Sequence, residues 1–224
     1  MIAGGASVPD KQAGPSPIQD GQWLAWATRL QALAQDGLLY AQSPFDTDRY
    51  AAVRRIASEM MAVGSPWAVE RIERLFDQEP GYATPKVDVR GLVWRDNKVL
   101  LVREQTEGRW TLPGGWADPG DTPSAAVERE ILEESGYTAR ATRLLAVYDR
   151  ATQGHTPPHP FAIYKLFLLC EMTGGRPQTS PETDAVGFFA LDELPDLSLA
   201  RVLPNQITKL VRLAETPEAP ADFD

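Results

Sequence analysis

The chain has 224 residues, enough for one large domain or two small ones. With 43% hydrophobic and 24% charged residues it has a globular composition, which excludes a fibrous repeat and global disorder. Its net charge of −9 disfavours a nucleic-acid partner, which needs a basic surface, and its single cysteine, Cys170, excludes a disulfide framework and a cysteine-based zinc site.

The predicted environment is the cytoplasm, without a membrane partner. No apolar run approaches the ~18 residues of a membrane-spanning helix. The N-terminus lacks the basic and then apolar pattern of a secretory signal. Residues 1–20 and 216–224 are rich in small and polar residues and have no apolar face to bury, so we expect both segments to be flexible tails.

Residues 21–80 are predicted to form a small N-terminal helical domain. Apolar residues recur at intervals of three and four, which indicates three amphipathic helices at about residues 23–37, 47–64 and 65–79. Gly37 and Gly64 are expected to end the first two helices. Ser65 and Pro66 have the N-cap and first-turn chemistry that begins a third.

These helices enclose too little apolar volume for a stable core of their own, so we expect them to pack on another surface. The segment contains Trp23, Trp26 and Trp67, which is more aromatic surface than so small a bundle can bury. Exposed aromatic surface is typical of protein interfaces. We therefore predict a homodimer with these helices in or beside its interface.

Residues 81–215 are predicted to form a second domain of mixed strands and helices. Alternating apolar and polar residues indicate strands at 86–95, 98–104, 138–148, 161–171 and 185–189, and helical periodicity indicates helices at 123–135 and 204–214. Asp96 and Asn97 are expected to form a hairpin turn between the first two strands. Strands in short runs around one central helix favour an α+β fold.

The clearest chemical signal lies in residues 114–137, GGWADPGDTPSAAVEREILEESGY. Glu130, Glu133 and Glu134 occupy positions i, i+3 and i+4 of the predicted helix, so their carboxylates share one face. Like charges on adjacent turns repel each other unless a cation lies between them. Oxygen ligands of this kind suit Mg²⁺ or Mn²⁺. For an isolated pattern, the alternative is an acidic helix face exposed to solvent.

This segment resembles the Nudix box, and the matching positions at the family's spacing are Gly115, Arg129, Glu130, Ile131, Glu133, Glu134 and Gly136. Two positions depart: Asp121 stands where the family has Glu, and Tyr137 replaces an aliphatic residue. Residues 86–213 are similar to a Nudix domain. The resemblance implies a Nudix-type α/β/α sandwich of mixed sheet, preceded by the small helical domain.

The resemblance also implies a metal site. Glu130 and Glu134 would be the main Mg²⁺ or Mn²⁺ ligands, with the backbone carbonyl of Gly115 nearby. Glu133 would bind a second metal or help to position the attacking water. Arg129, which can reach Glu133 or turn back toward Asp121, would orient a glutamate rather than touch the substrate.

Asp121 and Gly136 are interpreted as structural members of the motif. Asp121 is one methylene shorter than glutamate, so we expect it to weaken or re-route the tie between its loop and the helix without removing the metal site. Glu182 precedes the predicted strand at 185–189, where many Nudix enzymes bring an additional acid from a loop. It is our candidate for the catalytic base; an exposed turn acid is the alternative.

Three further residues are candidates for substrate binding. Trp116 could stack on a base or sugar, or could simply cover its loop. His155 and His159 lie in the segment GHTPPHP, where the prolines forbid a helix and so disfavour a paired-histidine metal site. Their loop could contact substrate or serve as a rigid connector.

The helical segment looks like the N-terminal extension of Nudix enzymes that act on nucleoside diphosphates linked to another group X, described as ADP-ribose or CDP-choline pyrophosphatases. We therefore expect a Mg²⁺-dependent pyrophosphohydrolase that converts a small nucleotide to a nucleoside monophosphate and a phosphorylated X. A catalytically weak nucleotide-sugar sensor, which would signal through the helical domain, and a hydrolase of damaged nucleoside triphosphates are the alternatives. The identity of the base remains open.

Overall fold

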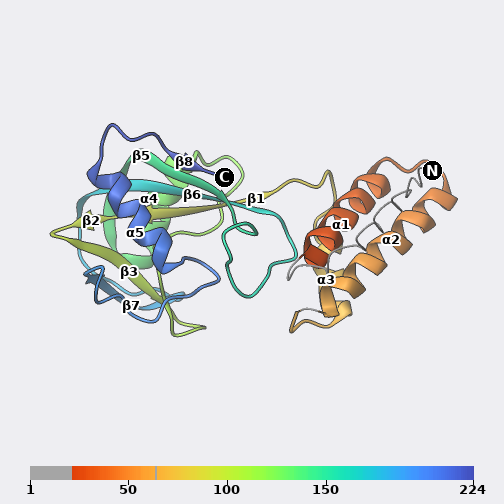
Figure 1. Ribbon diagram of the computed structural model, residues 1–224, viewed down its shortest axis with the longest axis horizontal. Coiled ribbons are helices and arrows are strands. Elements are labelled where there is room, and N and C mark those ends of the chain that lie inside the picture. Colours follow the sequence, from red (N-terminus) through yellow and green to blue (C-terminus); the bar gives the residue numbers. More distant parts are fainter. Residues whose placement is uncertain (1–21, 64) are drawn as a thin grey trace, which may run out of the picture.

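The computed structural model describes residues 22–63 and 65–224, so the tail expected at 1–20 lies outside the described residues. Figure 1 shows a bundle of helices and a larger part with sheets and helices, joined by an extended segment that leads into β1. The α+β fold predicted from the sequence is confirmed. None of the described helices combines the length and apolar character needed to cross a membrane.

The N-terminal helices are α1 (Gln22–Tyr40), α2 (Pro44–Val63) and α3 (Val69–Asp77). Helix α1 continues past Gly37, because that glycine provides close helix packing rather than a helix end: a Cβ at this position would lie 2.3 Å from a ring carbon of Tyr50 in α2. The N-cap of α3 is Ala68, and the Ser65 hydroxyl instead accepts a hydrogen bond from the Trp67 amide in the preceding turn.

A small core holds the helical bundle together and contacts the second domain. Ala27, Met61, Ile72 and Phe76 are buried in it, and Phe161 from the segment between β5 and β6 packs against them. The rings of Phe76 and Phe161 meet edge to face with their centroids 5.4 Å apart. The bundle therefore packs on another surface, as expected, and Phe161 supplies part of that surface.

The second domain contains two four-stranded sheets. The first has the order β1 (Lys86–Leu92), β6 (Ile163–Gly175), β5 (Tyr137–Asp149) and β8 (Asp222–Phe223); β1 is parallel to β6, and β5 is antiparallel to β6. The second joins β2 (Trp94–Arg95), β3 (Lys98–Glu104), β4 (Trp110–Thr111) and β7 (Thr183–Phe189), with β3 paired to β2, β4 and β7 in antiparallel fashion.

The hairpin turn expected at Asp96 and Asn97 is present, and both residues have positive φ angles, 51° and 58°, as a type I′ turn requires. The strand expected at 86–95 is divided, however. Only β2 pairs with β3, whereas β1 pairs with β6 in the other sheet. A residue pattern with period two identifies a strand but not its partner, so the change of sheet was not visible in the sequence.

Helices α4 (Pro123–Ser135) and α5 (Pro204–Glu215) lie where the sequence predicted them. Each helix contributes to one of the two main core clusters of the domain. The buried residues of α4 are packed with β1 and β6, and those of α5 with β5 and β6; they are Ala126, Val127 and Ile131 in α4, and Ile207, Leu210 and Val211 in α5. Thr122 caps α4 by accepting a hydrogen bond of 3.2 Å from the Ala125 amide.

The prediction of a flexible tail at 216–224 is wrong. Strand β8 in this segment pairs in parallel with β5. The Tyr148 hydroxyl donates a hydrogen bond of 2.5 Å to Asp222, and the Gln153 side chain donates one of 2.6 Å to Asp224. Composition suggested disorder because the segment has few apolar residues, but backbone pairing and polar contacts fix it without an apolar face.

Candidate active site

Residues 113–115, which lead into the candidate site, run beside β1 in an extended conformation. The Val89 amide donates to the Gly115 carbonyl over 2.8 Å, and the Gly91 amide donates to the Pro113 carbonyl over 2.9 Å. Gly114 lies between these contacts with φ +142°, and a Cβ there would be 2.0 Å from the Val89 carbonyl oxygen. Only glycine fits this position, which brings the backbone of the motif against the sheet.

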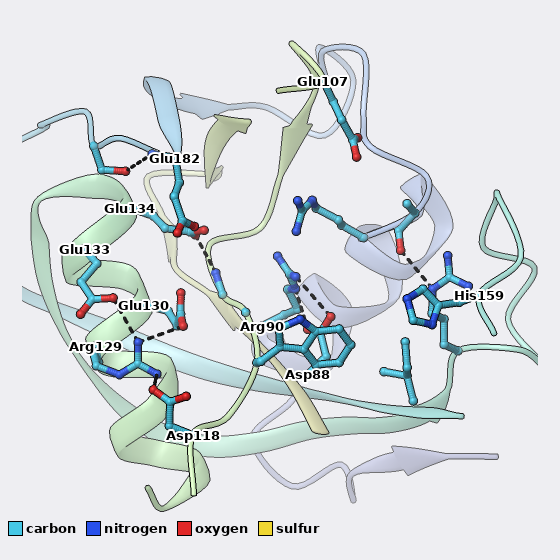
Figure 2. A pocket seen from close by; sticks show the side chains of 18 of the residues that line it. Asp88, Arg90, Glu107, Asp118, Arg129, Glu130, Glu133, Glu134, His159 and Glu182 are labelled. Atoms are coloured by element: carbon cyan, nitrogen blue, oxygen red, sulfur yellow. Dashed lines mark hydrogen bonds and ion pairs between the residues drawn. The ribbon is translucent and has the colours of Figure 1, made fainter. Parts of the chain in front are cut away.

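Helix α4 presents the predicted glutamates to this backbone. Glu134 is 4% exposed and accepts a hydrogen bond of 2.8 Å from the Gly114 amide. Burial raises the pKa of Glu134 to about 8. Glu130 lies close to Gly115, where a Cβ would be 3.0 Å from one of its carboxylate oxygens, and Glu133 is more exposed at 57%. All three line one pocket (Figure 2).

Arg129 binds several acids at once. Its guanidinium lies 3.0 Å from carboxylate oxygens of both Glu130 and Glu133. It also lies 3.4 Å from Asp121 and 3.4 Å from Asp118, a residue that no sequence motif had indicated. This geometry suits the orienting role predicted for Arg129. Two aspartates, Asp118 and Asp121, share the contact between Arg129 and the loop before α4.

The C-terminal end of α4 also fits its predicted role. Gly136 is the C-cap in the left-handed conformation, with φ 73°, and its amide donates to the Leu132 carbonyl. The turn ends the helix immediately after Glu134 and Ser135, both of which are buried.

The pocket has a volume of about 930 Å³ and brings together most of the predicted site residues. Gly115, Trp116, Arg129, Glu130, Glu133, Glu134, His159 and Glu182 all line it. In Figure 2, Glu182 lies on the same side of the pocket as Glu134, and His159 lies at the opposite side.

His155 does not line this pocket. Its side chain is 5% exposed, its Nδ1 lies 2.9 Å from the Leu199 carbonyl, and its Nε2 lies 3.2 Å from the Gln206 amide nitrogen. Burial lowers the pKa of His155 to about 4, so the ring is neutral near pH 7. Its contacts tie the segment after β5 to α5, which is a structural role rather than the predicted contact with substrate.

A buried ionic network at the wall of the pocket was not expected from the sequence. Asp88 accepts hydrogen bonds of 2.7 Å from both Arg90 and Lys165. Burial alone would raise the pKa of Asp88, but the two cations lower it to about 2. Asp88 and Arg90 alternate with apolar residues in β1, a pattern that indicates a strand with one face exposed to solvent. In the structure both Asp88 and Arg90 are buried, as is Val89 between them.

Other lining residues came from parts of the chain that gave no local signal. Trp67 reaches the pocket from the segment before α3, and its ring meets that of His159 at 6.2 Å. Arg150 follows β5, and Arg201 pairs with Glu104 over 2.9 Å. No motif connects these positions, because only the fold brings them together.

The donor set suits a divalent cation, although among residues 22–63 and 65–224 no three acidic, histidine or cysteine side chains are arranged as a metal cluster. Glu133 and Glu130 each accept a hydrogen bond of 3.0 Å from the same nitrogen of Arg129. Glu134 is a buried carboxylate, and repulsion from Glu130 adds to burial in raising its pKa. Two such carboxylates beside the Gly115 backbone fit a hard cation with oxygen ligands.

Two family models match the chain in succession. Residues 21–76 match the family described as "UDP-X-like, N-terminal oligomerisation domain", and residues 84–210 match the NUDIX domain. The two matches coincide with the helical bundle and with the domain that contains the pocket.

Individual relatives extend over nearly the whole chain. YjhB of Bacillus subtilis, provisionally named an ADP-ribose pyrophosphatase, is 43% identical over 203 residues, which are 91% of this chain and 97% of that protein. The crystal structure of a UDP-X diphosphatase is similar with a TM-score of 0.60 and 32% identity, covering 91% of this chain and 98% of that one.

An ADP-ribose pyrophosphatase from Streptococcus suis is similar over 63% of this chain and the whole of its own, with a TM-score of 0.57 and 35% identity. The family model, the relatives and the structural neighbours agree with the Nudix box on α4 and with the fold around it. The chain belongs to the Nudix hydrolase family.

Proposed function

We propose that this Nudix hydrolase is a Mg²⁺- or Mn²⁺-dependent pyrophosphohydrolase that cleaves a nucleoside diphosphate linked to a moiety X into a nucleoside monophosphate and a phosphorylated X. The observation that carries the proposal is the arrangement of the pocket. The glutamates of α4 and the Gly114–Gly115 backbone line it, and aromatic and cationic side chains line it as well. The pocket thus offers groups for a diphosphate and for a planar base in a single space.

Glu130 and Glu134 would hold the metal, with the Gly115 carbonyl beside them. A bound divalent cation would neutralise charge on the diphosphate oxygens and lower the pKa of a coordinated water. Arg129 would keep Glu130 in place through its contact of 3.0 Å. Glu133 would take part in holding a second cation or in positioning the attacking water.

Glu182 is the proposed general base. It lines the pocket in the loop before β7, and its backbone is held by a hydrogen bond of 3.1 Å from its amide to the Ser180 hydroxyl. A base at this place would take a proton from the attacking water on the side of the pocket where Glu134 lies. The backbone contacts would hold the loop while the side chain stays free to reorient.

Three aromatic rings are the proposed base-binding group. Trp116 is 47% exposed, although it lines the pocket, and its ring centroid lies 6.4 Å from that of His159. Trp67 approaches His159 from the helical domain. Burial lowers the pKa of His159 to about 4, so its ring is neutral near pH 7 and suited to stacking.

The choice of an X-linked diphosphate rests on the similarity along both domains. A protein named for ADP-ribose and a structure titled UDP-X diphosphatase each align with the helical extension as well as the catalytic domain. ADP-ribose and CDP-choline are our preferred substrates, and UDP-linked compounds belong in the same test.

A hydrolysis screen would test the proposal. The purified protein would be given ADP-ribose, CDP-choline, UDP-sugars, dinucleotides and nucleoside triphosphates with Mg²⁺ or Mn²⁺, and phosphate would be measured after phosphatase coupling. We expect the highest kcat/KM for an X-linked diphosphate. A preference for triphosphates would indicate a hydrolase of damaged nucleoside triphosphates. Tight binding of nucleotide sugars without turnover would indicate a sensor. Either result would contradict the proposal.

Variants of Asp121 would test how the loop before α4 is held. We expect Asp121→Glu to preserve or raise activity, because a longer carboxylate can close the present distance of 3.4 Å to Arg129. Asp121→Ala should lower kcat/KM by roughly tenfold. This is the lower end of the cost of a lost charge-assisted hydrogen bond, because Asp118 also contacts Arg129 and would keep part of the interaction. The measurement is kcat/KM against Mg²⁺ concentration. Indistinguishable curves for all variants would mean that Asp121 has no part in positioning the site.

We further propose that the helical domain forms a homodimer. Within the described helices, large apolar side chains remain exposed on α1 and α2, among them Leu33 at 65%, Tyr40 at 68%, Ile56 at 52% and Val63 at 89%. Leu33 and Tyr40 line an apolar groove of about 860 Å³ between the two helices. The matching family model is described as an oligomerisation domain, which supports a second copy of the chain as the occupant.

Substitution of Leu33 by aspartate is expected to convert the dimer to a monomer at micromolar concentration, because it places a charge in an apolar interface. Light scattering coupled to gel filtration would measure the mass. Leu132→Asp is the control, since Leu132 is exposed to a similar degree, 48%, but lies on α4. A wild-type monomer, or a Leu33→Asp dimer as stable as the wild type, would contradict the assignment.

A further inference from the structure

One arginine of the pocket lacks a carboxylate partner. Three others that line it, Arg90, Arg129 and Arg201, form ion pairs with acidic side chains. Arg150 lines the same pocket but forms no ion pair with any of the residues that the structure describes. Its charge is therefore the one in this group that the protein leaves without a direct counter-charge.

The side chain of Arg150 is nevertheless held in place. It is 6% exposed, its Nε donates to the Ala200 carbonyl over 3.3 Å, and one Nη donates to the Pro157 carbonyl over 2.7 Å. These carbonyls orient the guanidinium without neutralising it. The second Nη has no hydrogen-bond partner among the described residues, so donors remain for a ligand.

The charges around Arg150 are unbalanced. Asp88 is the acid that stabilises its charged form, and Asp88 already binds Arg90 and Lys165. Burial lowers the pKa of Lys165 to about 8, and repulsion from Arg90 and Arg150 contributes to this. One buried carboxylate is thus shared by three cations, and burying charge without a counter-ion is costly. A positive site of this kind is stabilised by an anion.

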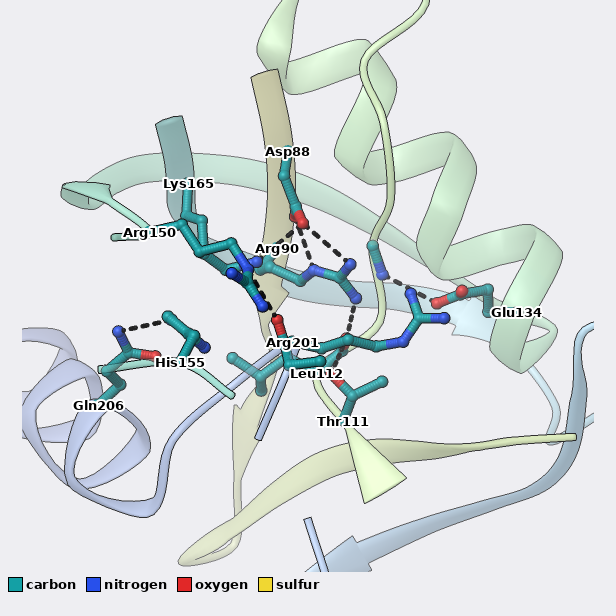
Figure 3. Close-up of polar contacts among 12 residues, drawn as sticks. Asp88, Arg90, Thr111, Leu112, Glu134, Arg150, His155, Lys165, Arg201 and Gln206 are labelled. Carbon is teal, nitrogen blue, oxygen red and sulfur yellow. Dashed lines mark hydrogen bonds and ion pairs between the residues drawn. The ribbon is translucent and has the colours of Figure 1, made fainter. Parts of the chain in front are cut away.

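The position of Arg150 indicates which part of a ligand it can reach. Figure 3 shows Arg90 between Arg150 and Glu134, so Arg150 lies away from the glutamates that would hold the metal. His159 lines the same pocket two residues after Pro157, whose carbonyl accepts the hydrogen bond from Arg150. The uncompensated cation is therefore at the aromatic end of the pocket.

We propose that Arg150 is an anion-binding residue of the substrate pocket, where its guanidinium donates to a phosphoryl or carboxylate oxygen of the substrate at the end away from Glu134. A guanidinium suits this task because its planar set of donors matches such an oxyanion. The oxygen belongs either to the diphosphate or to a further acidic group on one of the linked moieties. The assignment rests on the proposed function, since it presumes a nucleotide in this pocket.

Calorimetric titration in the presence of EDTA would test the proposal without turnover. The probes are adenosine, ADP-ribose, and ADP-ribose with an additional 2′-phosphate. We expect Arg150→Gln to weaken binding of at least one charged probe by about ten- to hundredfold while adenosine binding is unchanged, and Arg150→Lys to restore part of the affinity. Equal losses for both charged probes would identify the diphosphate as the ligand, and a loss confined to the phosphorylated probe would identify a further acidic group.

Arg140→Gln is the matched control, because Arg140 lies on β5, the strand that Arg150 directly follows, but is exposed and does not line the pocket. A purely structural role for Arg150 would lower thermal stability and weaken all three probes alike. That result, unchanged binding by Arg150→Gln, or no binding of charged probes by the wild type would overturn the proposal. Lack of hydrolysis in the substrate screen would instead contradict the proposed function, so the two failures are distinguishable.

Discussion

Glu134→Gln is expected to lower kcat/KM by several orders of magnitude and to leave the fold intact. The amide oxygen of glutamine can still accept the hydrogen bond that the Gly114 amide donates over 2.8 Å. What is lost is a charged metal ligand and with it the neutralisation of charge on the leaving phosphate. Because burial raises the pKa of Glu134 to about 8, removal of its charge should maintain or raise thermal stability without metal.

The matched control for this experiment is Glu128→Gln on the same helix. Glu128 does not line the pocket, and it accepts a hydrogen bond of 2.8 Å from the Ala141 amide. Turnover on the best substrate, Mg²⁺ affinity by calorimetry and the thermal unfolding curve would be measured for both variants. Near-normal turnover of Glu134→Gln at saturating Mg²⁺ would refute the role of this glutamate.

Asp88→Asn is expected to destabilise the protein by about 3–5 kcal/mol, the usual cost of removing one partner from a buried ion pair. The substitution leaves Arg90 and Lys165 buried without their shared carboxylate. Asp184→Asn is the control, because it breaks an exposed ion pair, in which the side chain of Asp184 is 38% exposed and that of Arg103 is 40% exposed. An exposed pair of this kind contributes at most about 1 kcal/mol. Urea unfolding would measure both free energies.

A double variant would test the cause. Lys165→Met in the Asp88→Asn background should recover part of the lost stability, because it removes one of the uncompensated cations. If Asp88→Asn were as stable as the wild type, the ionic network would have no structural role.

The same network predicts an effect of pH. Since the folded-state pKa of Asp88 is lowered from 3.8 to about 2, its contribution to stability is present above pH 3.8 and is lost as the pH falls toward 2.

Local sequence was sufficient for most of the secondary structure. The limits of α4 were predicted to the residue, since Thr122, Pro123 and Gly136 are strong helix-start and helix-end signals. Gly37 misled the prediction because a glycine that allows close helix packing has the same identity as one that ends a helix. The segment 216–224 misled it because pairing with β5 depends on a strand more than 70 residues away.

Helix α4 is the part of the candidate site that the sequence determined by itself. Glu130, Glu133 and Glu134 share a face through helical geometry alone, and the glycines before them mark the backbone that approaches them. Only the tertiary structure places four other residues in the pocket, namely Trp67, Asp88, Arg90 and Arg150. Alternation in β1 could indicate a strand, but pairing with β6 and the extended stretch at Gly115 determine that its charged face is buried. The number and placement of buried charges, and therefore the uncompensated Arg150, follow from contacts between distant segments, which no local pattern encodes.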